Sequence, residues 1–137
     1  MGGSQPLKLL LDTHIWLWSL AEPAKLSRRV RAAVTRAENE LWVSPISAWE
    51  LLVLAERGRV KLDSAPRTWV HEALSHTPAQ EAVLTFEVAV RSREIMLAHP
   101  DPADRFLVAT ALVYGLTLVT ADDTLIEAKP CPVLANR

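Results

Sequence analysis

Short apolar runs alternate along this chain with longer segments of helical pattern, and this alternation limits the possible folds more than any other feature. The runs KLLLD, ELWVS, EAVLT, LTLVT and CPVLA have the length of strands and occupy residues 8–12, 40–44, 81–85, 116–120 and 131–135. Segments with helical spacing or helix caps lie between them, at residues 13–20, 27–39, 45–57, 65–76, 87–98, 101–115 and 122–128. Strands that alternate with helices predict an α/β domain with a mainly parallel central sheet.

Length and composition indicate a single domain over residues 1–137, of which we expect residues 1–6 to be flexible. Half of the 137 residues are hydrophobic and 23% are charged, which excludes a disordered tail and a coiled coil. A domain of this size buries roughly two thirds of the surface that its unfolded chain exposes. The formal net charge of -1 gives no overall positive field, so any contact with nucleic acid must be local.

The sequence gives no indication of an oxidising compartment or of a membrane. Cys131 is the only cysteine, so an intramolecular disulfide is impossible. The apolar stretch from Leu7 to Leu11 is too short for a signal segment or a membrane span. We therefore expect a soluble, cytoplasmic protein.

Four acidic residues interrupt or end apolar segments. Asp12 ends the first predicted strand and Asp122 follows a later one, at the edge where parallel sheets bind ligands. Glu50 and Asp104 lie inside apolar helices, near their starts. Buried carboxylates that lie close together repel one another, and a divalent cation relieves that repulsion. Oxygen ligands without cysteine or paired histidines favour Mg²⁺ or Mn²⁺.

Most of these acids also have a simpler interpretation as helix caps. Asp12 stands at a predicted helix start, and Asp122 or Asp123 suits the cap of the last helix. Asp101 suits the cap of the helix that carries Asp104, and the helix dipole favours an acid at that position. Because one sequence does not show that the acids lie together, both interpretations stay open.

Four segments in order, LLLDTHIWLW, VSPISAWEL, HPDPADRFLVATAL and LTLVTADDTL, resemble the successive motifs of PIN-domain proteins. They resemble in particular the VapC-type toxins of bacterial toxin–antitoxin pairs, over residues Lys8 to Leu134. The resemblance implies a three-layer α/β/α sandwich and a Mg²⁺- or Mn²⁺-dependent endoribonuclease. By position, the resemblance implies four acidic site residues, namely Asp12, Glu50, Asp104 and Asp122. It also implies three supporting residues, namely Asp101, Thr120 and Ser47.

These residue types suggest that metal-activated water hydrolyses an RNA phosphodiester bond. Asp12, Asp104 and Asp122 would hold an ion, and Glu50 would either join them or orient the water. Whether one or two ions operate stays open. Without a catalytic histidine pair, cleavage through the 2'-hydroxyl is disfavoured, so we expect a 3'-hydroxyl and a 5'-phosphate product. Arg105 is expected to pair with a nearby acid or to meet phosphate.

Two basic segments are candidates for binding nucleic acid. One is the predicted helix over residues 27–39, with arginines at positions 28, 29, 31 and 36, and the other is ERGRVK at residues 56–61. Each segment either flanks a nucleic-acid cleft or forms a solvated face, and the sequence does not decide between them.

The resemblance also implies partners: a small cognate antitoxin, an RNA substrate such as tRNA or ribosomal RNA, and a second copy of the chain in a homodimer. Three other functions remain open, namely a metal-dependent DNA nuclease, a Mg²⁺-dependent phosphatase and a non-catalytic interaction domain. The phosphatase is disfavoured because THI follows Asp12, where such enzymes place a second aspartate two residues on.

Overall fold

Five parallel strands form the centre of the computed structural model, which describes residues 5–97 and 101–137. Most of the segment expected to be flexible, residues 1–4, lies outside the described residues. The strands are β1 (Lys8–Leu11), β2 (Glu40–Val43), β3 (Ala79–Glu81), β4 (Thr117–Thr120) and β5 (Val133–Ala135). Their order is β3-β2-β1-β4-β5 and each neighbouring pair is parallel. The chain therefore switches direction across the sheet between β1 and β4, where open α/β sheets bind ligands.

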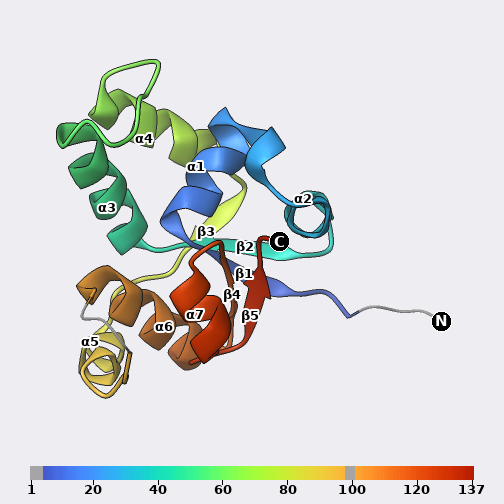
Figure 1. Ribbon diagram of the computed structural model, residues 1–137, viewed down its shortest axis with the longest axis vertical. Helices are drawn as coiled ribbons and strands as arrows, with labels where there is room; N and C mark the ends of the chain where they lie inside the picture. Colours follow the sequence, from blue (N-terminus) through green and yellow to red (C-terminus); the bar gives the residue numbers. More distant parts are fainter. Residues whose placement is uncertain (1–4, 98–100) are drawn as a thin grey trace.

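Helices cover both faces of the sheet (Figure 1). One layer contains α1 (Thr13–Ala21), α2 (Arg28–Thr35), α3 (Pro45–Glu56) and α4 (Pro66–His76), with a short 3-10 turn at Pro23–Lys25. The other contains α5 (Phe86–Ser92), α6 (Pro102–Tyr114) and α7 (Asp123–Ala128). The predicted three-layer α/β/α sandwich is confirmed. Within the described residues, no helix is long and apolar enough to span a bilayer.

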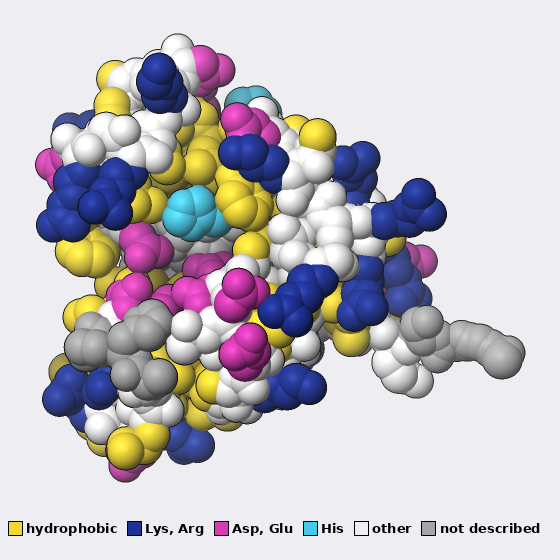
Figure 2. Space-filling model, in the orientation of Figure 1, with side chains coloured by type: hydrophobic (Ala, Val, Ile, Leu, Met, Phe, Trp, Pro, Cys, Tyr) yellow, Lys and Arg dark blue, Asp and Glu magenta, His cyan; other side chains and the backbone are white. Residues whose placement is uncertain are grey.

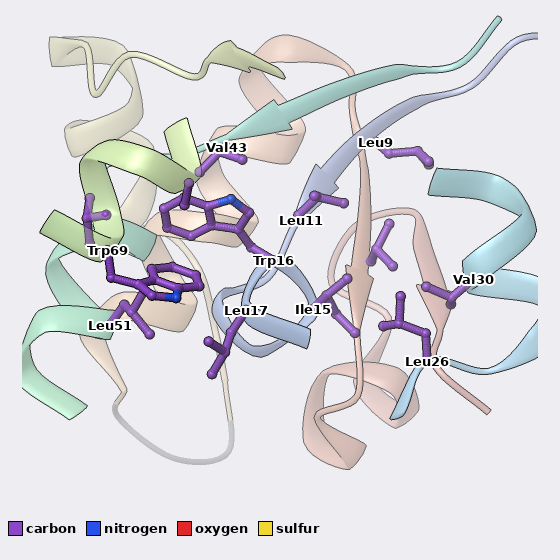
Figure 3. Close-up of a cluster of buried hydrophobic side chains, with 13 residues drawn as sticks. Leu9, Leu11, Ile15, Trp16, Leu17, Leu26, Val30, Val43, Leu51 and Trp69 are labelled. Carbon is purple, nitrogen blue, oxygen red and sulfur yellow. The ribbon is translucent and has the colours of Figure 1, made fainter. Parts of the chain in front are cut away.

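Alternate residues of β1 face the two helical layers, because successive side chains of a strand point to opposite faces. Leu9 and Leu11 join the core under α1, α2 and α4, whereas Leu10 joins the core under α6 and α7. In the first core, the fully buried Trp16 meets Trp69 edge to face, with 5.9 Å between ring centroids (Figure 3). A strand with apolar residues on both sides is a central strand, which positions the residue after it inside the molecule.

Three predicted elements differ from the structure by more than two residues at one end. The helix predicted over residues 27–39 ends at Thr35, and Asn39 instead donates its side-chain amide to the Ala33 carbonyl. The strand predicted at residues 81–85 lies at residues 79–81, because Thr85 caps the next helix by accepting from the Val88 amide. That helix, predicted to reach residue 98, ends at residue 92.

Candidate active site

Asp12 follows β1 and is held by hydrogen bonds to both of its carboxylate oxygens. Its backbone amide continues the sheet by donating to the Val119 carbonyl at 3.0 Å. The Thr13 amide donates to Oδ1 at 2.8 Å, and the Thr120 hydroxyl donates to Oδ2 at 2.6 Å. Burial raises the pKa of Asp12 and the nearby Asp122 adds to that rise, while the two hydrogen bonds and His14 oppose it. Asp12 is therefore a cap of α1 and also a fixed, buried carboxylate.

Asp122 lies beside Asp12 because Thr120, the last residue of β4, connects the two. The Thr120 hydroxyl accepts from the Asp122 amide at 3.0 Å and donates to Asp12. Asp122 also caps α7, since its Oδ1 accepts from the amides of Thr124 at 2.8 Å and Leu125 at 3.3 Å. One oxygen of Asp122 is thus used in the cap.

Asp104 and Asp101 come from the start of α6 and play different parts. Asp101 caps the helix by accepting from the Ala103 amide at 3.0 Å. Asp104, one turn into the helix, is 6% exposed and its carboxylate has no hydrogen-bond partner among the described residues. Burial raises the pKa of Asp104 from 3.8 to about 8, and the charges of Asp101, Asp12, Asp122 and Glu50 each add to the rise. A buried carboxylate without a partner is unfavourable in its charged form, unless it takes up a proton or a cation binds next to it.

Glu50 reaches the same place from α3, in the opposite helical layer. The Thr13 hydroxyl donates to its Oε1. Burial raises the pKa of Glu50, Asp12 and Asp101 add to the rise, and the Thr13 hydrogen bond and His14 oppose it. A helix on each side of the sheet therefore contributes an acid to the carboxyl edge of the strands.

These acids line one cleft of about 330 Å³, which we call the acidic cleft. Its lining consists of Asp12, His14, Trp18, Glu50, Asp101, Asp104, Ala121 and Asp122. Figure 2 shows acidic side chains gathered in the hollow between the two helical layers. The acids therefore lie close together, which the sequence left open, and three of them also cap helices. Among the residues that the structure describes, five carboxylates and no lysine or arginine line the acidic cleft.

The acidic cleft has donors that suit a hard divalent cation. Its carboxylate oxygens are the ligands that Mg²⁺ and Mn²⁺ prefer, and a cation would offset the repulsion that raises the pKa of Asp104. Over residues 5–97 and 101–137, no group of three His, Cys, Asp or Glu side chains stands close enough together to hold an ion as it is. The chemistry of the donors therefore fits the expected metal, while the side chains as placed do not form a ligand set.

Two predicted site residues lie outside the acidic cleft. Ser47 is fully buried in α3, lines no part of the cleft, and its hydroxyl has no hydrogen-bond partner. Arg105 is half-buried, does not line the cleft and forms no ion pair with a described residue. Pairing of Arg105 with a nearby acid is therefore not observed, and its contact with phosphate stays a prediction.

Sequence reasoning missed the part played by Thr13 and gave His14 and Trp18 no place in the site. Thr13 serves two acids, since its amide donates to Asp12 and its hydroxyl donates to Glu50. His14 and Trp18 line the acidic cleft one turn apart on α1, with 5.5 Å between their ring centroids. The signal was their spacing of four residues, which puts two side chains on one face of a helix.

An acid-lined cleft at the carboxyl edge of a parallel sheet is the ligand-binding position of open α/β folds, and comparison with known proteins identifies the family. The PIN domain family model matches residues 9–129, and the chain belongs to this family. It is 37% identical to Ribonuclease VapC22 of Mycobacterium tuberculosis over 118 residues. The aligned region covers 85% of this chain and 88% of that protein.

Solved structures of toxin–antitoxin complexes share the fold. A chain of VapBC2 from Rickettsia felis, bound to a DNA fragment from its promoter, matches with a TM-score of 0.69 and 12% identity, covering 94% of this chain and 98% of that one. A chain of FitAcB from Neisseria gonorrhoeae matches with a TM-score of 0.64 and 22% identity, covering 93% and 97%. At these identities the likeness concerns the fold.

Proposed function

We propose that the protein is a Mg²⁺- or Mn²⁺-dependent endoribonuclease that acts as the toxin of a toxin–antitoxin pair. The observation that carries the proposal is Asp104, a buried carboxylate that shares one cleft with four further acids and accepts no hydrogen bond from a residue that the structure describes. Such electrostatic repulsion between buried acids is typical of sites that bind a cation. The similarity to a ribonuclease over most of the chain supports RNA as the substrate.

In this mechanism Asp12, Asp104 and Asp122 would hold the metal, which would acidify a water and neutralise charge in the transition state. Thr120 keeps Asp12 and Asp122 in register through its two hydrogen bonds. Glu50 has a raised pKa and lies on the other wall of the acidic cleft, where it accepts the proton of the attacking water or orients it. Water attack leaves a 5'-phosphate and a 3'-hydroxyl.

The proposal includes partners and a place of action. Structural likeness to chains of toxin–antitoxin complexes supports a cognate antitoxin that holds the enzyme inactive. Large apolar side chains remain exposed, with Phe86 94% and Met96 89% accessible, as is typical of surfaces that a partner or a second copy covers. We propose a homodimer that meets antitoxin and RNA in the cytoplasm.

Cleavage of a mixed pool of structured RNA tests the proposal. The purified chain, free of antitoxin, is incubated with Mn²⁺, with Mg²⁺ or with EDTA, beside Asp12→Asn and Asp104→Asn. We expect metal-dependent products with 5'-phosphate ends, and a loss of at least about 100-fold in either variant. Cleavage that persists in EDTA, or products with a 2',3'-cyclic phosphate, would contradict the mechanism.

Two matched substrates separate the rival functions. DNA of the same sequence and a small phosphate monoester are offered under the same conditions. A preference for DNA would identify a DNA nuclease, and turnover of the monoester alone would identify a phosphatase. If no substrate is cut and calorimetry detects no Mn²⁺ binding, the carboxylates are caps of a non-catalytic domain.

A further inference from the structure

A second cleft adjoins the acidic cleft and shares two of its lining residues. It has a volume of about 420 Å³, and His14 and Trp18 line both clefts. Its remaining walls include Lys25, Arg59 and Lys61, so we call it the basic cleft. A chain molecule that lies in the acidic cleft and passes the His14 and Trp18 side chains therefore enters the basic cleft next.

The cations of the basic cleft are available to an outside anion. Lys25 pairs with the exposed Glu22 at 2.8 Å and lies over the Trp18 ring, 5.5 Å from its centroid. Arg59 and Lys61 are exposed and form no ion pair with any described residue. Three cations and one acid thus face a cleft beside another that is lined by five acids. This charge pattern suits a polyanion with one phosphate in the acidic cleft and the neighbouring phosphates in the basic cleft.

The segment that carries these cations is anchored to the fold. Gly58, with φ of 68°, turns the chain at the end of α3, and the Arg59 amide donates to the Leu54 carbonyl at 2.9 Å. Val60 and Leu62 pack against the core beneath α1 and α4. Arg59 and Lys61 alternate along the chain with these two apolar residues, and both cations are exposed.

The other basic segment of the sequence has no such position. In α2, Arg31 donates to the Pro23 carbonyl at 2.7 Å, and Arg36, which follows the helix, pairs with Glu38 at 3.4 Å. Arg28 and Arg29 are exposed, and none of the α2 arginines lines the acidic or the basic cleft. The structure therefore distinguishes the two basic segments that the sequence left equal.

We propose that the basic cleft binds the single-stranded RNA segment next to the scissile phosphate, with Arg59 and Lys61 each neutralising one phosphate. This inference rests on the proposed function, because it places the substrate of that same site. Single-stranded nucleic acid is held by positive grooves that follow the backbone beside aromatic side chains, and Trp18 supplies an aromatic wall here. The acidic cleft repels phosphate until a cation is present, so anchoring of the strand falls to the basic cleft.

The test measures binding of a short, fluorescently labelled single-stranded RNA by anisotropy, in EDTA and over a series of KCl concentrations. The double variant Arg59→Ala/Lys61→Ala is compared with the control Arg28→Ala/Arg29→Ala, which removes equal charge from α2. We expect the first pair to weaken binding and to reduce the slope of log K against log salt by about 1.4, or about 0.7 for each lost phosphate contact. The control pair leaves the slope unchanged.

Three outcomes would overturn the proposal. Equal slopes for both pairs would mean that only the overall charge matters, and an unchanged slope in the first pair would mean that its cations meet no phosphate. Weaker binding of a polyglutamate peptide with unchanged RNA binding would assign the basic cleft to a protein partner.

Cleavage kinetics then separate this inference from the proposed function. In the first pair we expect KM to rise while kcat is kept. Metal-dependent cleavage with an unchanged KM in that pair would refute the RNA path alone. Binding that behaves as expected, without cleavage in any metal, would refute the nuclease alone.

Discussion

The two sides of the acidic cleft hold their carboxylates in opposite ways. On the strand side, Asp12 and Asp122 accept hydrogen bonds from backbone amides, and the Thr120 hydroxyl also donates to Asp12. On the α6 side, Asp101 takes the cap and Asp104 accepts no hydrogen bond from a described residue. Burial and the neighbouring acids raise the pKa of Asp104 to about 8. The acids at the strand ends are thus held by hydrogen bonds from the chain itself. Asp104 lacks such bonds from the described residues and remains available to a proton or a cation.

The largest expected effect comes from Asp104→Asn, which removes the uncompensated charge and keeps the shape. Cleavage falls by at least about 100-fold because a metal ligand is lost. The metal-free variant is nevertheless more stable than the wild type at pH 8, since its neighbours no longer repel a carboxylate there. Thermal melts in EDTA, beside the cleavage assay, measure both effects.

The pH dependence of that gain follows from the raised pKa of Asp104. Between pH 3.8 and about 8 only the folded wild type holds the proton, so its free energy of unfolding falls as pH rises. The advantage of Asp104→Asn is therefore absent near pH 3.8 and largest near pH 8. Asp123→Asn, at an exposed acid paired with Arg137, is the matched control and should show no such growth. A wild type more stable than Asp104→Asn at pH 8 would contradict this account.

A smaller effect is expected from Thr120→Val on the strand side. The change removes the donor to Asp12 and the acceptor for the Asp122 amide inside a fully buried position. Loss of these bonds should lower the free energy of unfolding by about 1–3 kcal/mol and raise the pKa of Asp12 further. Urea denaturation measures the change, and Thr120→Ser should restore it. If serine fails to do so, the methyl group and not the hydroxyl holds the two strand ends.

Most of the fold followed from the sequence, while part of the site did not. The apolar runs and caps predicted five strands in a mainly parallel sheet, because burial on both faces and cap chemistry are local signals, whereas the three layers were implied by the family resemblance. The strand predicted at residues 81–85 was misplaced because Ala82 belongs to the opposite core and Thr85 to a cap, which only tertiary packing decides. Asp12 and Asp122 were found at strand ends for the same local reason.

The cap and site interpretations of the acids exclude each other in a sequence but not in the structure. Asp12, Asp101 and Asp122 cap helices and also line the acidic cleft. A cap uses backbone amides at the start of a helix, and the starts of α1, α6 and α7 meet at the carboxyl edge of the sheet. What the sequence does not contain is the distance between those starts.

The smallest expected effect concerns Thr13, which links the strand side to Glu50 of α3. Thr13→Val keeps the amide that donates to Asp12 and removes only the hydroxyl that donates to Glu50. Because that bond opposes the rise in the pKa of Glu50, its loss should move the acid limb of the cleavage rate profile to higher pH. Rate measurements across pH in Mn²⁺ detect the shift, and Thr13→Ser should reverse it. A lower rate at every pH without a shift would mean that Glu50 is not the group that titrates, and the acid limb would then report on the metal ligands.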